Sequence, residues 1–189
     1  MKRLVLTSAL IIFFAFSSFS QGMEPGMGYF SIGFGPGSSY MYRAASLSPA
    51  FRMTFDHGFK EIGPGTLTIG GMLGTSFGSN RSAYINYVHK YSWVNITAAF
   101  RVAYYYNLSE FEIENLNVYG GFSSGPRYYI FTNTYEGTYT GNQLDFPNTF
   151  KFHFGSFLGA NYFITPRTAV FTEFGYDISW FTLGVTLKM

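Results

Sequence analysis

The sequence predicts an all-β protein: an eight-stranded antiparallel up-and-down transmembrane β-barrel, preceded by a cleaved signal peptide. In the final strand, apolar residues alternate with Thr, Gly or Lys, the apolar ones being Phe181, Leu183, Val185, Leu187 and Met189. Aromatic residues make up 22% of the chain and charged residues only 12%, about half the charge usual in soluble domains. No segment after residue 20 is a continuous apolar run long enough for a spanning helix. Apolar residues spread by alternation are what a membrane barrel requires.

Residues 1–20 have the pattern of a secretory signal. Lys2 and Arg3 precede an apolar run over 4–16, and small residues near Ser20 suit cleavage after that position. The run is shorter than the ~20 residues of a membrane anchor. We therefore expect a signal peptide at 1–20 and a single barrel domain at 21–189. Without Lys2 and Arg3, basic and acidic residues balance, which argues against a strongly basic nucleic-acid binder.

Eight segments alternate in the manner of strands, namely about 29–35, 50–57, 66–77, 93–106, 117–130, 150–163, 168–176 and 181–189. In the first, Phe and Ile alternate with Ser and Gly. In the second, Phe and Met alternate with Arg52, Thr54 and Asp56. In the third and fourth, Leu, Ile, Val and Phe alternate with Thr, Gly, Asn and, in the fourth, Arg101.

The remaining segments follow the same rule with one irregularity. Segment 117–130 is rich in glycine and contains Pro126, which removes a ladder hydrogen bond unless a bulge is present. In 150–163, Phe residues alternate with Lys151, His153 and Gly155. In 168–176, Val and Phe alternate with Glu173. With the terminal segment the strands number eight, and an even number is typical of outer-membrane barrels.

The connections alternate between short and long, as they do in outer-membrane barrels. The inner turns are expected at 57–65, 107–116 and 164–167, and the outer loops at 36–49, 78–92, 131–149 and 177–179. Aromatic girdles are expected at both membrane interfaces. The inner girdle would comprise Tyr104, Tyr105, Tyr106, Tyr162 and Phe163, and the outer one Tyr91, Trp93, Phe150, Tyr176, Trp180 and Phe181.

The chain resembles the small eight-stranded outer-membrane β-barrel proteins, of the OmpA-transmembrane, OmpX-like or porin-like kind common in Bacteroidota. The signal at 1–20, the strand end 159–163, the turn 165–167, Glu173–Tyr176 and the terminal strand carry this resemblance. It implies a Gram-negative outer-membrane location, insertion by the barrel-assembly machinery through the C-terminal strand, and contact with lipid and lipopolysaccharide. That strand usually ends in an aromatic residue in the family, whereas this chain ends in Met189.

The alternation places a set of charged residues inside the barrel: Glu173, Arg101, Arg127, Arg52, Asp56, Lys151 and Lys188. A basic side chain facing lipid at mid-depth would cost ~2–4 kcal/mol, and an acidic one less, which favours the inward assignment. The preferred interpretation is an ion-paired plug, because an eight-stranded barrel is just wide enough for side chains to fill. The alternative, implied by the resemblance to OmpA-type barrels, is a gate for a minor small-solute pore. The basic excess predicts weak anion preference for such a pore.

Other function classes find less support. A lipid-modifying enzyme would need a base, and the only histidines are His57, His89 and His153, of which His89 follows Ser82 in an expected loop. We predict no catalytic, metal or cofactor site, and a monomer. A structural or surface-interaction role remains, with an extracellular ligand bound by loop tyrosines, namely Tyr40, Tyr42, Tyr84, Tyr87, Tyr91, Tyr135 and Tyr139. The competing class is a soluble exported β-barrel that binds an apolar ligand inside.

Overall fold

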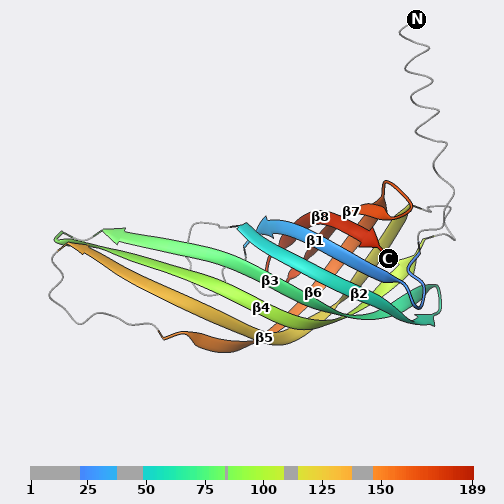
Figure 1. Ribbon diagram of the computed structural model, residues 1–189, viewed down its shortest axis with the longest axis horizontal. Helices are drawn as coiled ribbons and strands as arrows, with labels where there is room; N and C mark the ends of the chain where they lie inside the picture. Colours follow the sequence, from blue (N-terminus) through green and yellow to red (C-terminus); the bar gives the residue numbers. More distant parts are fainter. Residues whose placement is uncertain (1–21, 38–48, 84, 109–114, 138–146) are drawn as a thin grey trace, which may run out of the picture.

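The computed structural model describes residues 22–37, 49–83, 85–108, 115–137 and 147–189. It confirms the all-β prediction with eight strands (Figure 1). These are β1 (Gly28–Pro36), β2 (Pro49–Ile62), β3 (Gly65–Ala83), β4 (Tyr87–Asn107), β5 (Leu116–Gly137), β6 (Thr149–Phe163), β7 (Thr168–Tyr176) and β8 (Phe181–Lys188). The predicted signal at 1–20 lies outside the described residues. Among the described residues, no helix is long and apolar enough to cross a membrane.

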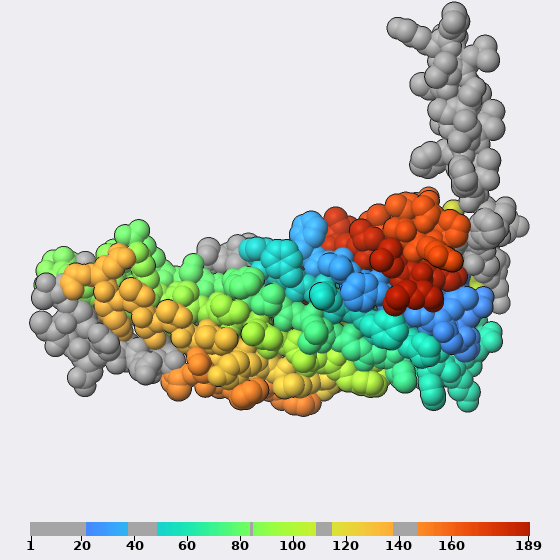
Figure 2. All heavy atoms as spheres, in the orientation of Figure 1, coloured from blue at the N-terminus to red at the C-terminus, as the bar shows by residue number. Residues whose placement is uncertain are grey.

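Each strand pairs antiparallel with its neighbours in the sequence, and β1 also pairs with β8, so the sheet closes into a barrel. Figure 2 shows β8, in red, directly beside β1, in blue. The closing seam continues to the last residue, where the Met189 amide donates to the Gly28 carbonyl at 2.8 Å. At its other end, the Ser179 hydroxyl donates to the Pro36 carbonyl at 2.6 Å. Closure removes the edges of the ring.

The predicted alternation sets which side chains face inward. The apolar positions of the strands are exposed on the outer wall, including Phe152 at 77%, Leu158 at 71% and Phe154 at 61%. The interleaved positions are buried and mostly polar, with Arg101 1% exposed and Thr97 and Thr186 0%. The barrel is therefore apolar outside and polar inside, the reverse of a water-soluble domain.

The strands differ more in length than the sequence predicted. β3, β4 and β5 contain 19, 21 and 22 residues, whereas β1, β7 and β8 contain 9, 9 and 8. The three long strands run on together beyond the ring (Figure 1). We call residues 77–83, 87–94 and 130–137 the β3–β5 extension. The prediction of outer loops was therefore wrong for most of 78–92 and for the start of 131–149, because these residues form paired strands.

The polar composition of these segments explains the error. They are rich in Ser, Asn, Thr and Tyr, which suit loops as well as a strand with water on one face. On the face of the extension that continues the barrel interior, Tyr91 and Trp93 form a buried aromatic cluster with Tyr129, the residue just before the extension in β5. Phe131 packs against this cluster. Tyr91 and Trp93 were therefore wrongly expected on the outer girdle. The same correction applies at the other end of the barrel to Tyr105 and Phe163, which are 4% and 3% exposed.

Pro126 interrupts β5 without a bulge. The β4–β5 register is the same on both sides of it, with Thr97 opposite Arg127 and Phe100 opposite Ser124, but the two intervening pairs are missing. On its other side, Pro126 stays paired with Phe152 of β6. A proline has no N–H to donate, so the ladder has a local gap while both strands keep their direction.

Candidate functional site

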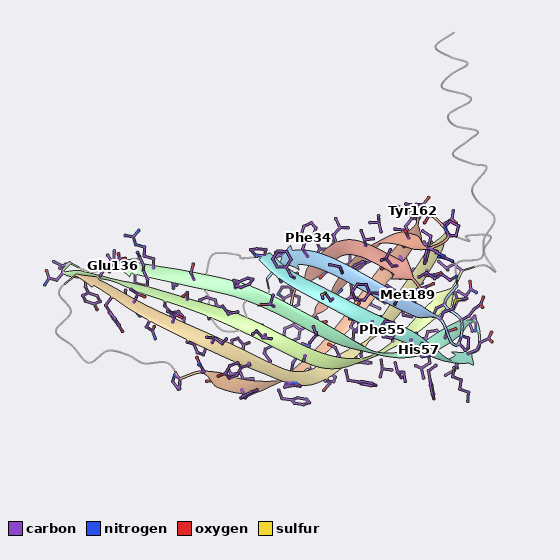
Figure 3. The ribbon with its side chains drawn as sticks, in the orientation of Figure 1. Phe34, Phe55, His57, Glu136, Tyr162 and Met189 are labelled. Carbon is purple, nitrogen blue, oxygen red and sulfur yellow. The ribbon has the colours of Figure 1, made fainter. Side chains whose placement is uncertain are left out.

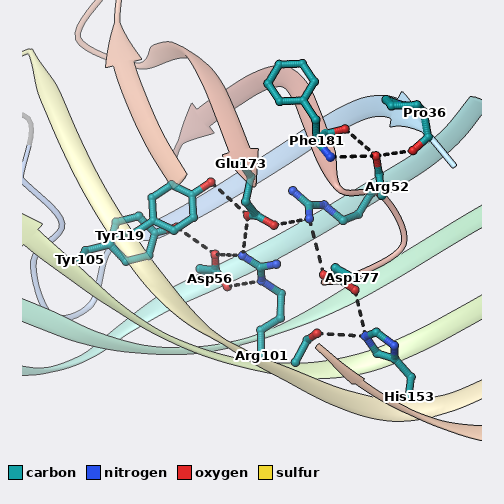
Figure 4. A network of polar contacts seen from close by, with 12 residues as sticks. Pro36, Arg52, Asp56, Arg101, Tyr105, Tyr119, His153, Glu173, Asp177 and Phe181 are labelled. Carbon is teal, nitrogen blue, oxygen red and sulfur yellow. Dashed lines mark hydrogen bonds and ion pairs between the residues drawn. The ribbon is translucent and has the colours of Figure 1, made fainter. Parts of the chain in front are cut away.

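Four of the predicted inward charges meet in the middle of the barrel, around Arg101 of β4 (Figure 4). Arg101 Nε donates to Asp56 Oδ1 of β2 at 3.2 Å, and its Nη2 donates to Glu173 Oε2 of β7 at 3.2 Å. Arg52, two residues before Thr54 on the same inward face of β2, forms a short ion pair with the other oxygen of Glu173. All four side chains are at most 5% exposed, so each charge depends on its partners rather than on water.

A second arm of the network runs toward the end of the barrel that bears the extension. Arg52 Nη1 lies 3.6 Å from Asp177 Oδ2, and Asp177 Oδ1 lies 2.9 Å from His153 Nε2. The His153 ring accepts through Nδ1 from Arg127 Nη2 at 2.7 Å. Arg127 Nε then donates to Thr97 Oγ1 at 2.9 Å. The polar chain thus links β2, β4, β5 and β6 with the β7–β8 turn.

Aromatic side chains close the network on the side of the chain termini. The Tyr105 hydroxyl donates to Asp56 Oδ2 at 2.9 Å, and the Tyr119 hydroxyl donates to Glu173 Oε2 at 3.2 Å. The two tyrosine rings stack with centroids 4.7 Å apart. The Arg101 guanidinium lies over the Phe157 ring at 3.8 Å, a cation–π contact strengthened by the dry surroundings. The interior is a packed polar plug.

Buried charge in the plug is balanced, which corrects the expected basic excess. Three arginines (Arg52, Arg101 and Arg127) accompany three carboxylates (Asp56, Glu173 and Asp177), all at most 5% exposed. Lys151 lies on the lumen side of β6 but is exposed, with its ammonium 5.9 Å from the Tyr129 ring. Lys188 is half-buried near the closing end of β8. The predicted anion preference therefore loses its basis.

Two members of the network were missed from the sequence. Asp177 follows β7 and was assigned to a tight outer turn, yet it is 1% exposed because the turn folds inward over the barrel mouth. The sequence placed His153 on the inward face of 150–163, but it was not included in the predicted set of lumenal charges. Its alternation with exposed Phe152 and Phe154 was the available signal for its burial.

Ser123, His153 and Asp177 have the composition of a catalytic triad but not its hydrogen bonding. Ser123 Oγ and Asp177 Oδ1 lie 3.0 and 2.9 Å from the same ring atom, Nε2. Arg127 can only donate, so Nδ1 accepts, and in a neutral ring Nε2 carries the proton. Nε2 then has no lone pair to take a proton from Ser123, so the arrangement does not activate a serine nucleophile.

The other two histidines lie on strands away from this network. His89 is in β4 rather than in a loop, stacked on Tyr135 with centroids 4.5 Å apart, and its Nε2 lies 3.3 Å from Asn133 Oδ1. Ser82 is its cross-strand partner on β3. His57 is stacked on Phe55, near the end of the barrel away from the extension (Figure 3).

The C-terminal strand presents its predicted apolar row outward. Leu183, Val185, Leu187 and Met189 are 40–65% exposed, whereas Thr182 and Thr186 are buried. Thr186 Oγ1 donates to Asn161 Oδ1 at 2.9 Å, which fixes the inward face of β8 to β6 across the lumen.

The fold resembles two solved outer-membrane proteins. One is Ail, the attachment invasion locus protein of Yersinia pestis, in complex with the heparin analogue sucrose octasulfate. It superposes with a TM-score of 0.53 at 12% identity, covering 87% of this chain and 99% of that chain. The other is OprG from Pseudomonas aeruginosa, with a TM-score of 0.51 at 11% identity, covering 90% and 99% of the two chains. No protein-family model and no curated sequence matches this chain. At this identity the likeness establishes the barrel fold.

Proposed function

We propose that this chain is an integral outer-membrane β-barrel of a Gram-negative bacterium, exported by a signal peptide cleaved after residue 20. We further propose a structural and surface-interaction role, with the plugged barrel as an anchor and the β3–β5 extension as the part presented outside the cell. The finer resemblance to OmpA-transmembrane and OmpX-like barrels of Bacteroidota belongs to this proposal, as do insertion by the barrel-assembly machinery and a monomeric state.

The outer wall of the barrel is the observation that carries the proposal. Every strand exposes at least one large apolar side chain, while Arg52, Asp56, Arg101, Arg127 and Glu173 are buried inside. Along β6, this surface runs from Phe150 to Tyr162. At about 3.3 Å per residue and a strand tilt of about 40°, that span rises about 30 Å, the thickness of a bilayer hydrocarbon core.

A soluble barrel with an apolar cavity fits this distribution poorly. Its outer wall would have to be wet and its interior apolar. Here the interior holds the Arg101–Asp56–Glu173 ion pairs and a series of buried Thr and Asn side chains. A pore is also not favoured, because the network crosses the lumen between β2, β4 and β7.

The extension supports the surface-interaction part. It stands beyond the ring at the end opposite the C-terminus (Figure 1). It carries Tyr87, Tyr91 and Tyr135 of the predicted contact residues, whereas Tyr40, Tyr42, Tyr84 and Tyr139 lie outside the described residues. The similarly folded Ail was solved with a sulfated sugar analogue bound, which makes acidic saccharides a reasonable class to test here.

The test is the gel mobility of the mature chain refolded in lipid vesicles, with and without boiling in SDS. A closed membrane barrel resists unheated SDS, so we expect two different apparent masses. A chain that stays folded without detergent or lipid, and whose mobility does not depend on heating, would contradict the proposal and favour the soluble barrel.

A further inference from the structure

The outward face of the extension contains a pair of like charges that Glu136, with its single negative charge, balances only in part. Arg81 of β3 and Lys90 of β4 are directly opposite each other in the ladder. Like charges at such positions destabilise a sheet. Lys90 forms a short, exposed ion pair with Glu136 of β5. Among the described residues, Arg81 has no carboxylate within 4.0 Å, but its charge also acts on Glu136 and helps to lower the pKa of that carboxyl.

These two cations flank a hollow of about 570 Å³ in the same face. The hydroxyl residues Ser79, Ser92 and Thr134 also line it. Ser79 and Ser92 are cross-strand partners, one step nearer the barrel than the Arg81–Lys90 pair. The hollow therefore combines two positive donors with neutral hydroxyl donors, a combination that suits the oxygens of a phosphate group.

The distance of the hollow from the apolar outer surface indicates which source of phosphate could reach it, a membrane lipid or a free molecule. Phe77 is the last large apolar residue exposed on the outer face of β3. Ser79 and Arg81 stand two and four residues beyond it, about 5 and 10 Å higher at the strand rise and tilt used above. The polar layer on each side of a bilayer is about 5–8 Å thick, and an arginine can bend its head toward that layer.

We propose that Arg81 and Lys90 form a binding site for the phosphate of an outer-leaflet lipid headgroup, with the hydroxyls of Ser79, Ser92 and Thr134 as additional donors. This inference rests on the proposed outer-membrane location. The bound phosphate would neutralise the like-charge pair and hold the extension against the membrane surface. Glu136, shown at the far tip of the extension in Figure 3, competes with the phosphate for Lys90.

Because Glu136 competes with the phosphate for Lys90, two variants should change lipid retention in opposite directions. The refolded full-length mature barrel is studied in a neutral detergent, and native mass spectrometry measures retention of diphosphorylated lipid A and of the same lipid without phosphates. Arg81→Gln combined with Lys90→Gln should weaken retention of the phosphorylated lipid about 10- to 100-fold. Glu136→Gln should strengthen it about two- to fivefold. Lys60→Gln, which removes one positive charge from β2 at the end of the barrel away from the extension, should leave it unchanged.

Several outcomes would overturn the proposal. They are equal retention of the two lipids, an unchanged affinity in the double variant, or loss of affinity with Glu136→Gln. Binding of soluble sucrose octasulfate through Arg81 and Lys90 without lipid A retention would assign the site to an external saccharide and reject the lipid. Heat-dependent gel mobility of every variant separates these results from a failure of the membrane assignment itself.

Discussion

Neutralising Glu173 should be the most damaging conservative change in the barrel. Its carboxylate accepts hydrogen bonds from Arg52, Arg101 and the Tyr119 hydroxyl, and Glu173 is only 3% exposed. Glu173→Gln keeps the shape and removes the charge. Three buried arginines would then face only Asp56 and Asp177, leaving one positive charge unmatched in a dry interior.

Breaking a buried ion pair by removing one partner costs about 3–5 kcal/mol. At about 1.4 kcal/mol per tenfold change, the folded-to-unfolded ratio should fall about 10²- to 10⁴-fold. The assay is reversible urea unfolding in lipid vesicles, followed by tryptophan fluorescence and by the heat-dependent gel shift. Glu136→Gln, which removes the same charge from an exposed pair, is the matched control and should leave the midpoint within error.

A second variant tests the electrostatic cause. Adding Arg52→Met to Glu173→Gln restores equal numbers of buried charges, so the double variant should be more stable than Glu173→Gln alone. A loss below about 1 kcal/mol for Glu173→Gln, or a double variant less stable than the sum of its single changes, would refute the charge-balance reasoning.

Three further predictions concern other parts of the molecule. Gly35→Ala should destabilise the closed barrel by about 1–3 kcal/mol in the same unfolding assay, because the added Cβ would lie 1.8 Å from the Phe181 carbonyl oxygen of β8. Gly71→Ala is the control and should be neutral, because the nearest atom to its added Cβ would be 3.8 Å away. Trp93→Ala should make the extension sensitive to protease while the barrel keeps its heat-dependent mobility; loss of both would show that the two parts are not separable. The hydrogen bond from Lys90 lowers the pKa of Glu136, so in Lys90→Gln the NMR-detected titration of the Glu136 carboxylate should move to higher pH. Any stability that this ion pair contributes is present above the usual pKa of glutamate, and it is lost as the pH falls through the lowered pKa of Glu136.

The period-two pattern was sufficient to predict which face of each strand is apolar, because a membrane barrel forces every second residue into lipid. It could not place strand ends. The extension is polar on its water-exposed face, so its sequence is as compatible with loop as with strand. It also could not locate Asp177, whose burial depends on how a turn folds over the lumen rather than on any strand alternation.

The ion pairs also constrain the order in which the barrel can assemble. Arg52 and Glu173 are 121 residues apart in the chain, and Arg101 and Glu173 are 72 apart. Strands β1 to β6 bring all three buried arginines but only Asp56, while both remaining carboxylates arrive with β7 and the turn that follows it. A partly built sheet would therefore carry uncompensated positive charge into lipid. If the proposed outer-membrane location holds, the last hairpin supplies these counter-charges, so we expect membrane insertion and ring closure to occur together as one late, cooperative step of high contact order.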